Sequence, residues 1–339
     1  MKNIVVIGAG FAGLWSAIAA VRKLDELSIT LDQVRVTLIN RDAWHGIRVR
    51  NYESDLSQIR VPLDRVLAPT GVRLIEGEVT AIDPKARSIV VQTPNGQQDI
   101  IYDRLVLAAG SRVFLPDIPG LAEHGLNIDT YNETKKLDLH LKGLSYQAQS
   151  DGWNTVLVIG AGLTGIEIAC EMPNRLKAVG IQPGRVILAD RLQHIGSDMG
   201  THARAVIERA LDSLGIEIRT AIKVAAIGDH GVTLTDGERI SARTVVWCAG
   251  MVASPLAARL PGERDRWGRL LVDEFLKVKG LDDMYAAGDI AAANIDNGHT
   301  SVMSCQHARP MGRFAGHNAV SDLLGEKPLP LNIPWYSTC

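Results

Sequence analysis

Two copies of one glycine pattern constrain the fold of this chain more than any other feature. In residues 4–13, four β-forming residues run into Gly-x-Gly-x-x-Gly, and residues 14–21 then favour a helix. Residues 156–165 repeat the pattern ahead of a second helix-forming run. The glycines of the two copies are Gly8, Gly10, Gly13, Gly160, Gly162 and Gly165. The first glycine permits a tight turn, the second lets the backbone approach a pyrophosphate, and the third lets helix and strand pack closely. Because the helix N-terminus also attracts phosphate, the sequence predicts two dinucleotide-binding units.

The composition is that of an ordinary globular protein. The chain has 339 residues, which is enough for two domains, and its net charge of −2 gives no electrostatic reason to bind nucleic acid. Residues 4–21 are uncharged behind Lys2, but their glycines argue against a signal peptide or membrane anchor. The four cysteines have no disulfide or metal-ligand spacing, so we expect a reducing, cytoplasmic location. They are Cys170, Cys248, Cys305 and Cys339.

The two copies continue in the same order, which predicts an internal duplication at the scale of a domain. A second strand follows each glycine pattern and ends in Asn40 in one copy and Asp190 in the other. An acid at this place normally accepts hydrogen bonds from the adenosine ribose; the Asn40 amide oxygen can accept but carries no charge. Each copy closes on a buried strand and an Ala-Gly turn, at Gly110 and at Gly250.

The remaining segments show less regular patterns. Residues 71–83 predict a strand pair, and residues 88–102 a hairpin around Pro94-Asn95-Gly96. We expect helices at 132–144, 201–214 and 306–324. Residues 43–66 are polar and irregular: they either form a solvated loop and helix beside the first domain or line a pocket for polar or anionic groups. After a strand, Asp289 either faces the crevice and holds a sugar-like polyol or caps a helix.

Taken together in chain order, the two glycine patterns, the two Ala-Gly turns and the strand that ends at Asp289 resemble the motifs of flavoproteins with two dinucleotide-binding domains. The resemblance covers nearly the whole chain. The runs 245–250 and 253–256, with Thr164-Gly165-Ile166-Glu167, are most similar to type II NADH dehydrogenases (NADH:quinone oxidoreductases). The resemblance implies an α/β fold with two Rossmann-like domains. A discontinuous FAD-binding domain (1–114 and 251–339) would carry an inserted NAD(P)H-binding domain (115–250).

The resemblance also implies roles for individual residues. The first glycine pattern would hold the FAD pyrophosphate, the Val79 backbone the adenine, and Asp289 the ribityl chain. The second pattern and Asp190 would hold the nicotinamide nucleotide. Glu167, near the nicotinamide, and Gln306, at a helix N-terminus facing the flavin, would be the catalytic residues. The other predicted cofactor contacts are Phe11, Ala12, Asn40, Arg41, Ala109, Gly110, Thr164, Gly250 and Gly288.

The implied activity is FAD-dependent oxidation of NADH, with electrons passed to a quinone or another small acceptor. Asp190 predicts NADH rather than NADPH, although Arg191 beside it could pair with a 2′-phosphate. Three departures from the type II pattern predict weaker or less lipid-dependent quinone reduction. Pro310 replaces the second glutamine of Ala-Gln-x-Ala-x-Gln, and residues 44–60 are charged, with Arg48, Arg50 and Arg60. The chain also ends at Cys339, short of the C-terminal segment that usually anchors these enzymes to membrane.

Other functions remain open at this point. Disulfide reductases need a closely spaced cysteine pair, which the sequence lacks. A sulfide:quinone oxidoreductase would need Cys305 and Cys339 beside the flavin, and a nucleotide-sensing or scaffold protein would keep FAD without turnover. His299 and His307 lack a third ligand, so we expect no metal and place these histidines at the surface or at a helix cap. A small-molecule acceptor is the expected partner, and a homodimer is allowed. A peripheral membrane contact is also allowed, although nothing in this chain supports it.

Overall fold

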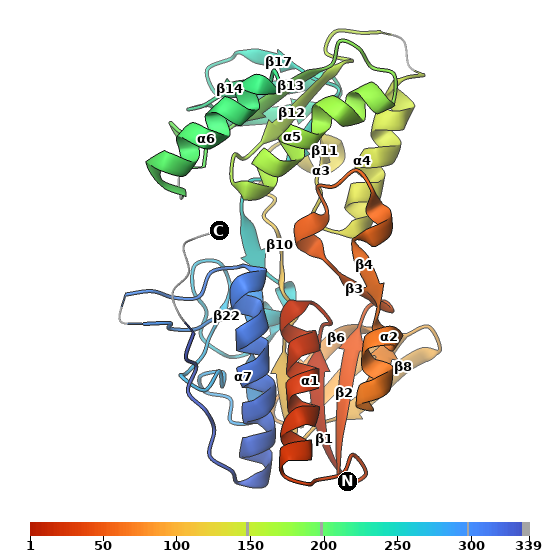
Figure 1. Cartoon of the computed structure of the whole chain (residues 1–339), viewed down its shortest axis with the longest axis vertical. Helices are drawn as coiled ribbons and strands as arrows, with labels where there is room; N and C mark the ends of the chain where they lie inside the picture. The colour runs from red at the N-terminus through yellow and green to blue at the C-terminus, as the bar shows by residue number, and fades with distance from the viewer. Residues whose placement is uncertain (147–148, 197–198, 297, 334–339) are drawn as a thin grey trace. The chain divides into compact units, whose positions relative to one another are not determined.

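The computed structural model describes residues 1–146, 149–196, 199–296 and 298–333, which fold into two compact units (Figure 1). Unit 1 comprises residues 1–47 and 60–112 and the described residues after 250; unit 2 comprises 48–59 and 113–250. This division differs from the predicted boundaries by two residues at 113–114 and, more substantially, at residues 48–59. The reason is a set of contacts within unit 2: the Asn51 side chain donates to the carbonyls of Ile128 (2.9 Å) and Asp129 (3.2 Å), and Tyr52 packs against that unit's core.

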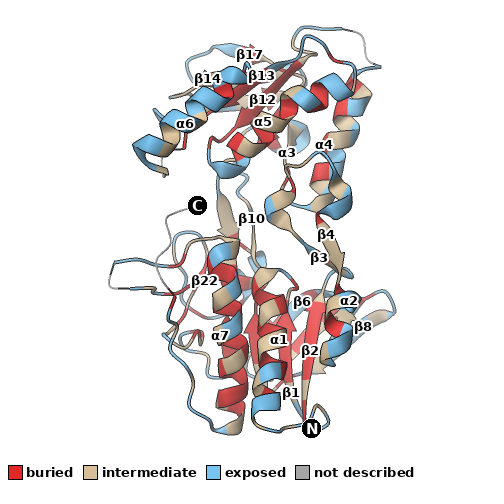
Figure 2. Ribbon diagram, viewed as in Figure 1, coloured by how far each residue is buried: buried red, intermediate tan, exposed pale blue. Residues whose placement is uncertain are grey.

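Unit 1 is built on a five-stranded parallel sheet with the order β21-β9-β1-β2-β5. Its strands are β1 (Lys2–Ile7), β2 (Val34–Asn40), β5 (Arg73–Glu76), β9 (Arg104–Leu107) and β21 (Met284–Ala286). β1 is buried from Ile4 to Ile7, as Figure 2 shows for the strands of this sheet. Such a continuous apolar run is what a parallel strand covered on both faces requires.

Three helices and several small strand pairs complete unit 1. The helices are α1 (Phe11–Glu26), α2 (Leu63–Leu67) and α7 (Cys305–Leu324). A three-stranded antiparallel sheet contains β6 (Glu78–Asp83), β7 (Ser88–Thr93) and β8 (Gly96–Ile101). The strand pairs are β3 (Trp44–Gly46) with β4 (Arg60–Pro62), β10 (Ser111–Val113) with β19 (Met251–Ala253), and β20 (Leu270–Leu271) with β22 (Ala291–Ala292). Short 3-10 helices are η3 (Ala68–Thr70), η5 (Pro255–Arg259) and η6 (Gly288–Ile290).

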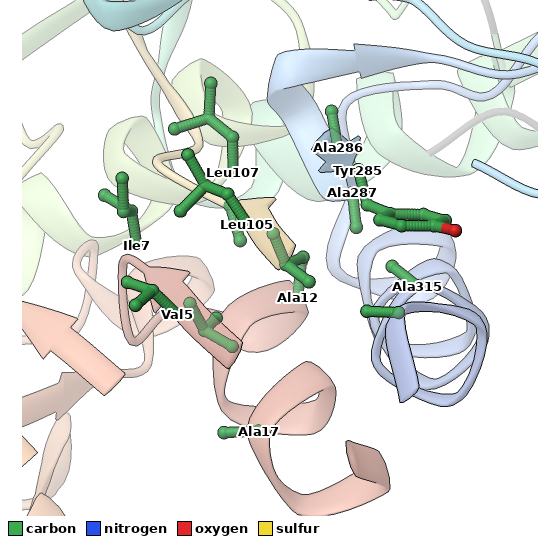
Figure 3. Packing of buried hydrophobic residues seen from close by; sticks show 14 of the residues in the cluster. Val5, Ile7, Ala12, Ala17, Leu105, Leu107, Tyr285, Ala286, Ala287 and Ala315 are labelled. Carbon is green, nitrogen blue, oxygen red and sulfur yellow. The ribbon is translucent and has the colours of Figure 1, made fainter. Parts of the chain in front are cut away.

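Helices α1 and α7 lie side by side against the sheet (Figure 1). Two glycines of α7 make this close approach possible. A Cβ atom on Gly312 would lie 2.2 Å from the Ala12 carbonyl oxygen, and one on Gly316 would lie 2.0 Å from that of Ser16. Figure 3 shows the core beneath them, where Val5, Leu105 and Tyr285 of three strands pack with small residues of both helices.

Unit 2 repeats the design with a parallel sheet of order β11-β18-β12-β13-β14. Its strands are β11 (Gly125–Leu126), β12 (Thr155–Ile159), β13 (Arg185–Ala189), β14 (Glu217–Arg219) and β18 (Thr244–Trp247). An antiparallel sheet holds β15 (Val224–Gly228), β16 (Gly231–Leu234) and β17 (Arg239–Ser241). The helices are α3 (Leu121–His124), α4 (Tyr131–Leu144), α5 (Leu163–Ala178) and α6 (Gly200–Ser213), with 3-10 turns η1 (Arg48–Arg50) and η2 (Leu56–Gln58).

Alternate residues of the unit 2 strands build two separate cores. Val156, Val158 and Leu188 pack with helices α4 and α5, whereas Leu157 and Ile187 pack with the antiparallel sheet. This follows from strand geometry, because successive side chains point to opposite faces. Both faces are therefore covered, as the apolar runs of the sequence predicted.

The α/β fold class is confirmed, and the duplication extends to topology. The strand order β9-β1-β2-β5 of unit 1 corresponds to β18-β12-β13-β14 of unit 2. In each unit a three-stranded antiparallel sheet is inserted in the chain between the last two of these strands, β5 and β9 or β14 and β18. The predicted strand pair at 71–83 is wrong as a pair. β5 and β6 occupy different sheets, because the Gly77 N–H donates to the Asn40 carbonyl and the chain then enters the antiparallel sheet. The hairpin at 88–102 is confirmed as β7 and β8.

Candidate functional site

The first glycine loop joins β1 to α1, and its three glycines serve different purposes. Gly8 has φ +96°, and a Cβ there would lie 2.5 Å from the Ala108 carbonyl oxygen. A Cβ on Gly13 would lie 1.7 Å from the Gly8 carbonyl oxygen. A Cβ on Gly10 would have no protein atom within 4 Å apart from its own neighbours along the chain. The protein's own packing therefore requires Gly8 and Gly13, whereas Gly10 leaves the backbone open to a ligand.

The second glycine loop, between β12 and α5, has the same geometry. Gly160 has φ +104°, and its Cβ would lie 2.8 Å from the Ala249 nitrogen; a Cβ on Gly165 would lie 1.7 Å from the Gly160 oxygen. Gly162 again has no atom within 4 Å of a Cβ. Each open glycine is an extended N-cap without a side-chain hydrogen bond, so neither helix end is closed by a side-chain cap of its own. Both loops thus fit the pyrophosphate of a dinucleotide.

The strand-end residues Asn40 and Asp190 hold these loops. The Ala9 N–H donates to the Asn40 side-chain oxygen at 2.9 Å, and the Ala161 N–H donates to an Asp190 carboxylate oxygen at 2.7 Å. The other Asp190 oxygen accepts from the Leu192 N–H at 2.8 Å. A carboxylate has about four acceptor positions, so Asp190 keeps capacity for a ribose hydroxyl.

His45, in strand β3, contacts the first glycine loop and is a residue that the sequence did not point to. Its Nδ1 lies 2.7 Å from the Ala9 carbonyl oxygen, to which a protonated Nδ1 donates. The Phe11 ring meets the imidazole edge-on, with centroids 5.1 Å apart. His45 is 8% exposed, although it comes from a polar stretch. Asn40 therefore binds the N–H of Ala9 and His45 binds its carbonyl. No local sequence pattern predicts the His45 contact.

Within unit 1, the N-terminus of helix α7 lies close to the N-terminus of α1, which follows the first loop. Gly288 (φ +77°) lies against α1 and α7, because its Cβ would be 2.8 Å from the Cβ of Ala12 and 3.4 Å from that of Ala308. Asp289 follows in η6, and the Ser111 hydroxyl donates to its carboxylate at 2.6 Å. The turn that carries Asp289 therefore packs against the first turns of both α1 and α7.

Gln306 occupies the first turn of α7 and is exposed. Ser304 caps this helix by accepting from the His307 N–H at 3.3 Å. Pro310 lies inside α7, which continues past it. Because proline has no backbone N–H, the Gln306 carbonyl lacks the usual helical hydrogen bond from residue 310. His307 is 1% exposed, which corrects the expected surface position: its Nδ1 accepts from the Val302 N–H at 2.9 Å, and burial lowers its pKa.

The other predicted cofactor residues lie as follows. In unit 1, Val79 is buried in β6 beside the parallel sheet, Ala109 is half-buried and Arg41 is exposed. Gly110 and Gly250 both have positive φ, +68° and +86°, at the equivalent Ala-Gly turns of the two units. Thr164 is exposed in the first turn of α5.

Glu167 lies half-buried on α5 in unit 2, and burial raises the pKa of its carboxyl. The pKa of Tyr52 is raised by burial and then by the negative charge of Glu167. Burial also raises the pKa of the Cys170 thiol, and it raises that of Cys248 to about 12. Neither thiol is therefore a thiolate near neutral pH, and no disulfide joins any two of Cys170, Cys248 and Cys305.

The arginines of the charged segment 44–60 contact other residues of the protein. Arg48 pairs with Asp129, and Arg50 pairs with Glu53 at 2.5 Å. The guanidinium of Arg60 stacks over the Trp44 ring, 4.2 Å from its centroid. These contacts disfavour a cluster of arginines that is available to an anionic acceptor.

Two further expectations concern metal and membrane. The described residues contain no group of three or more histidine, cysteine or acidic side chains that could hold a metal ion. His299 instead contacts Asp296, with Nδ1 2.7 Å from a carboxylate oxygen. Within the ranges that the structure describes, no helix is both long and apolar enough to cross a membrane. Cys339, on which the sulfide:quinone alternative depended, lies outside the described residues.

Comparison with known proteins places this geometry in context. A family model described as pyridine nucleotide-disulphide oxidoreductase matches residues 2–312. An NADH dehydrogenase-like protein of Mycobacterium tuberculosis is 53% identical over 343 residues, covering 100% of this chain and 85% of that protein. A type II NADH:quinone oxidoreductase of Staphylococcus aureus is 28% identical over 314 residues, covering 86% of this chain and 75% of that protein.

Solved structures share the fold. NDH2 from Plasmodium falciparum, in complex with RYL-552, superposes with a TM-score of 0.81 over 98% of this chain and 87% of that one. At 12% sequence identity this likeness shows the fold alone. Two other structures of this fold were solved with a nicotinamide nucleotide: NDH2 from Plasmodium falciparum with NADH (TM-score 0.72) and an engineered water-forming NADPH oxidase with NADPH (TM-score 0.77).

Proposed function

Because this chain belongs to the pyridine nucleotide-disulphide oxidoreductase family, we propose that it is an FAD-dependent NADH oxidoreductase that passes electrons to a quinone or another small acceptor. The observation that carries the proposal is the pair of open glycines, Gly10 and Gly162. Each lies where a Cβ would touch no protein atom, yet each begins a long helix directly after a buried strand. A dinucleotide phosphate approaching the backbone accounts for glycine at both places.

The residues of unit 1 fit FAD. The N–H groups at the start of α1 would bind its pyrophosphate, and Asp289, oriented by Ser111, would accept hydrogen bonds from the ribityl hydroxyls. The α7 N-terminus near Gln306 would place its positive dipole end beside the isoalloxazine. When bound, FAD supplies the redox chemistry by accepting hydride from NADH and releasing electrons to the second acceptor.

The residues of unit 2 would hold the nicotinamide nucleotide. The second glycine loop would bind its pyrophosphate, and Asp190, already fixed by two backbone N–H groups, would face the adenosine ribose. A role for Glu167 beside the nicotinamide stays a prediction, as do the cytoplasmic location and the oligomeric state.

The identity of the acceptor is the finer part of the proposal. Support for a quinone comes from the type II relative and from Gln306, which is exposed at the start of α7. Pro310 cannot supply the hydrogen bonds that a second glutamine would give, and losing one such bond costs on the order of 1 kcal/mol. We therefore propose quinone reduction that is weaker or less lipid-dependent than in the type II enzymes that this chain resembles.

One experiment tests the function and its rivals. The purified yellow protein is mixed anaerobically with NADH, and flavin absorbance is followed, after which soluble quinones, ferricyanide, oxygen or sulfide-derived acceptors are added. An oxidoreductase loses its yellow colour within seconds and regains it with its acceptor. A nucleotide-sensing or scaffold flavoprotein would stay yellow, and that result would reject the proposal.

A further inference from the structure

Unit 1 contains a cavity that none of the predicted cofactor residues lines. Its volume is about 440 Å³, within the range of small-molecule sites. It lies along the paired strands β20 and β22 and the loop that precedes them. Its polar and aromatic lining residues are Asp265, Arg266, Trp267, Arg269, Lys279, Asn294 and Thr300, and the Asp265 carboxylate pairs with Arg269.

Trp267 forms a fixed aromatic wall of this cavity. Trp267 is 39% exposed, and two guanidinium groups lie near its ring, that of Arg266 3.9 Å and that of Arg269 5.1 Å from the centroid. The backbone is held as well, because the Trp267 N–H donates to Asp265 at 2.9 Å and its carbonyl accepts from Ala253 at 2.9 Å. Trp267 therefore offers an exposed aromatic surface whose backbone position is already fixed.

The cations of the cavity differ in what they contact. Arg269 is buried and already committed, since it pairs with Asp265 at 2.7 Å and donates to the Ser301 carbonyl. Arg266 and Lys279 are exposed at the rim, and neither forms an ion pair with any residue that the structure describes. The cavity thus keeps two uncompensated positive charges, and a concave, partly apolar wall strengthens their field.

We propose that this cavity, called the Trp267 pocket, binds a small dianion with a planar apolar part. Its phosphate or carboxylate groups would lie between Arg266 and Lys279, and its planar part would lie against Trp267. An arginine stacked on an aromatic ring can still direct its N–H groups at an anion in the ring plane. The Asn294 amide and the Thr300 hydroxyl offer neutral hydrogen bonds at the same rim. The proposal does not depend on the redox function.

Calorimetric titration of the flavin-loaded protein tests the proposal with phenyl phosphate, which carries both features and no adenine. Benzene-1,3-dicarboxylate tests whether carboxylates serve as well as phosphate, and inorganic phosphate and phenol test each half alone. We expect phenyl phosphate to bind with a dissociation constant of about 1 mM or lower. Phenol and phosphate should each bind at least tenfold more weakly.

Variants locate the binding. Arg266→Gln with Lys279→Gln should weaken phenyl phosphate binding at least tenfold. The matched control, Arg73→Gln with Lys85→Gln, removes two exposed, unpaired cations from the same unit and should change nothing. Trp267→Leu should weaken phenyl phosphate but not inorganic phosphate. The proposal is overturned if wild-type protein binds neither dianion, or if the Arg266/Lys279 double variant binds as tightly as the control.

Discussion

Replacing two glycines of the first loop by alanine separates cofactor binding from folding. Gly10 has φ −70° and ψ −169°, which alanine adopts freely, and a Cβ there touches nothing. Gly13 lies three residues on, but its Cβ would be 1.7 Å from the Gly8 carbonyl oxygen. We therefore expect Gly10→Ala to fold and lose FAD, and Gly13→Ala to fold poorly.

The structure sets the size of both effects. For Gly10→Ala, reduced entropy of the unfolded chain stabilises by about 0.4–1 kcal/mol, and the poorer N-cap costs about as much. The net change in unfolding free energy is close to zero. In Gly13→Ala, helix α1 and the Gly8 carbonyl would have to separate by well over 1 Å before the new Cβ and that oxygen reached an ordinary contact distance. Overpacking costs about 1–3 kcal/mol where side chains can yield, so about 3 kcal/mol or more is expected here.

The assay compares apo-protein stability with FAD affinity. Thermal unfolding by circular dichroism should place Gly10→Ala within a few degrees of wild type and lower the Tm of Gly13→Ala by roughly 6–12 °C. Titration with FAD should show at least about tenfold weaker binding to Gly10→Ala, which is about 1.4 kcal/mol. Wild-type FAD affinity in Gly10→Ala would refute the pyrophosphate site, and wild-type stability in Gly13→Ala would refute the packing argument.

Four further outcomes follow from the same geometry. Asp289→Ala should stay folded and retain much less flavin after purification; full yellow colour would make Asp289 only a structural cap. Catalytic efficiency should favour NADH over NADPH because of the Asp190 carboxylate, and equal use of both would reject that role. His45→Ala should weaken FAD binding several-fold, since one hydrogen bond contributes about 1 kcal/mol, while NADH affinity stays unchanged. Burial raises the pKa of Glu167, so the ionised carboxylate destabilises the folded state. Glu167→Gln should therefore raise the unfolding free energy at pH 7, and this gain should vanish below the ordinary carboxyl pKa, where Glu167 is protonated in both states.

The sequence by itself determined the architecture of each unit. Apolar runs of four to five residues, such as 4–7 and 156–159, can be buried only as strands covered on both faces, and the glycines after them specify the turn into a helix. These patterns are local, so they can be recognised without knowing what the strand packs against. The hairpin of β7 and β8 was predictable for the same reason, because Asn95-Gly96 encodes the turn.

Tertiary structure decided how distant residues share the site. His45 meets Ala9, Gly288 meets Ala12, and Gly312 lets α7 lie on α1, although no local pattern marks any of these pairs. From their position in the chain, residues 48–59 were expected in the FAD-binding domain, but they belong to unit 2. The Asn51 side chain donates to carbonyl groups of that unit. Such contacts depend on side-chain shape and hydrogen-bond geometry across the fold, whereas periodicity and turn chemistry report only on neighbours along the chain.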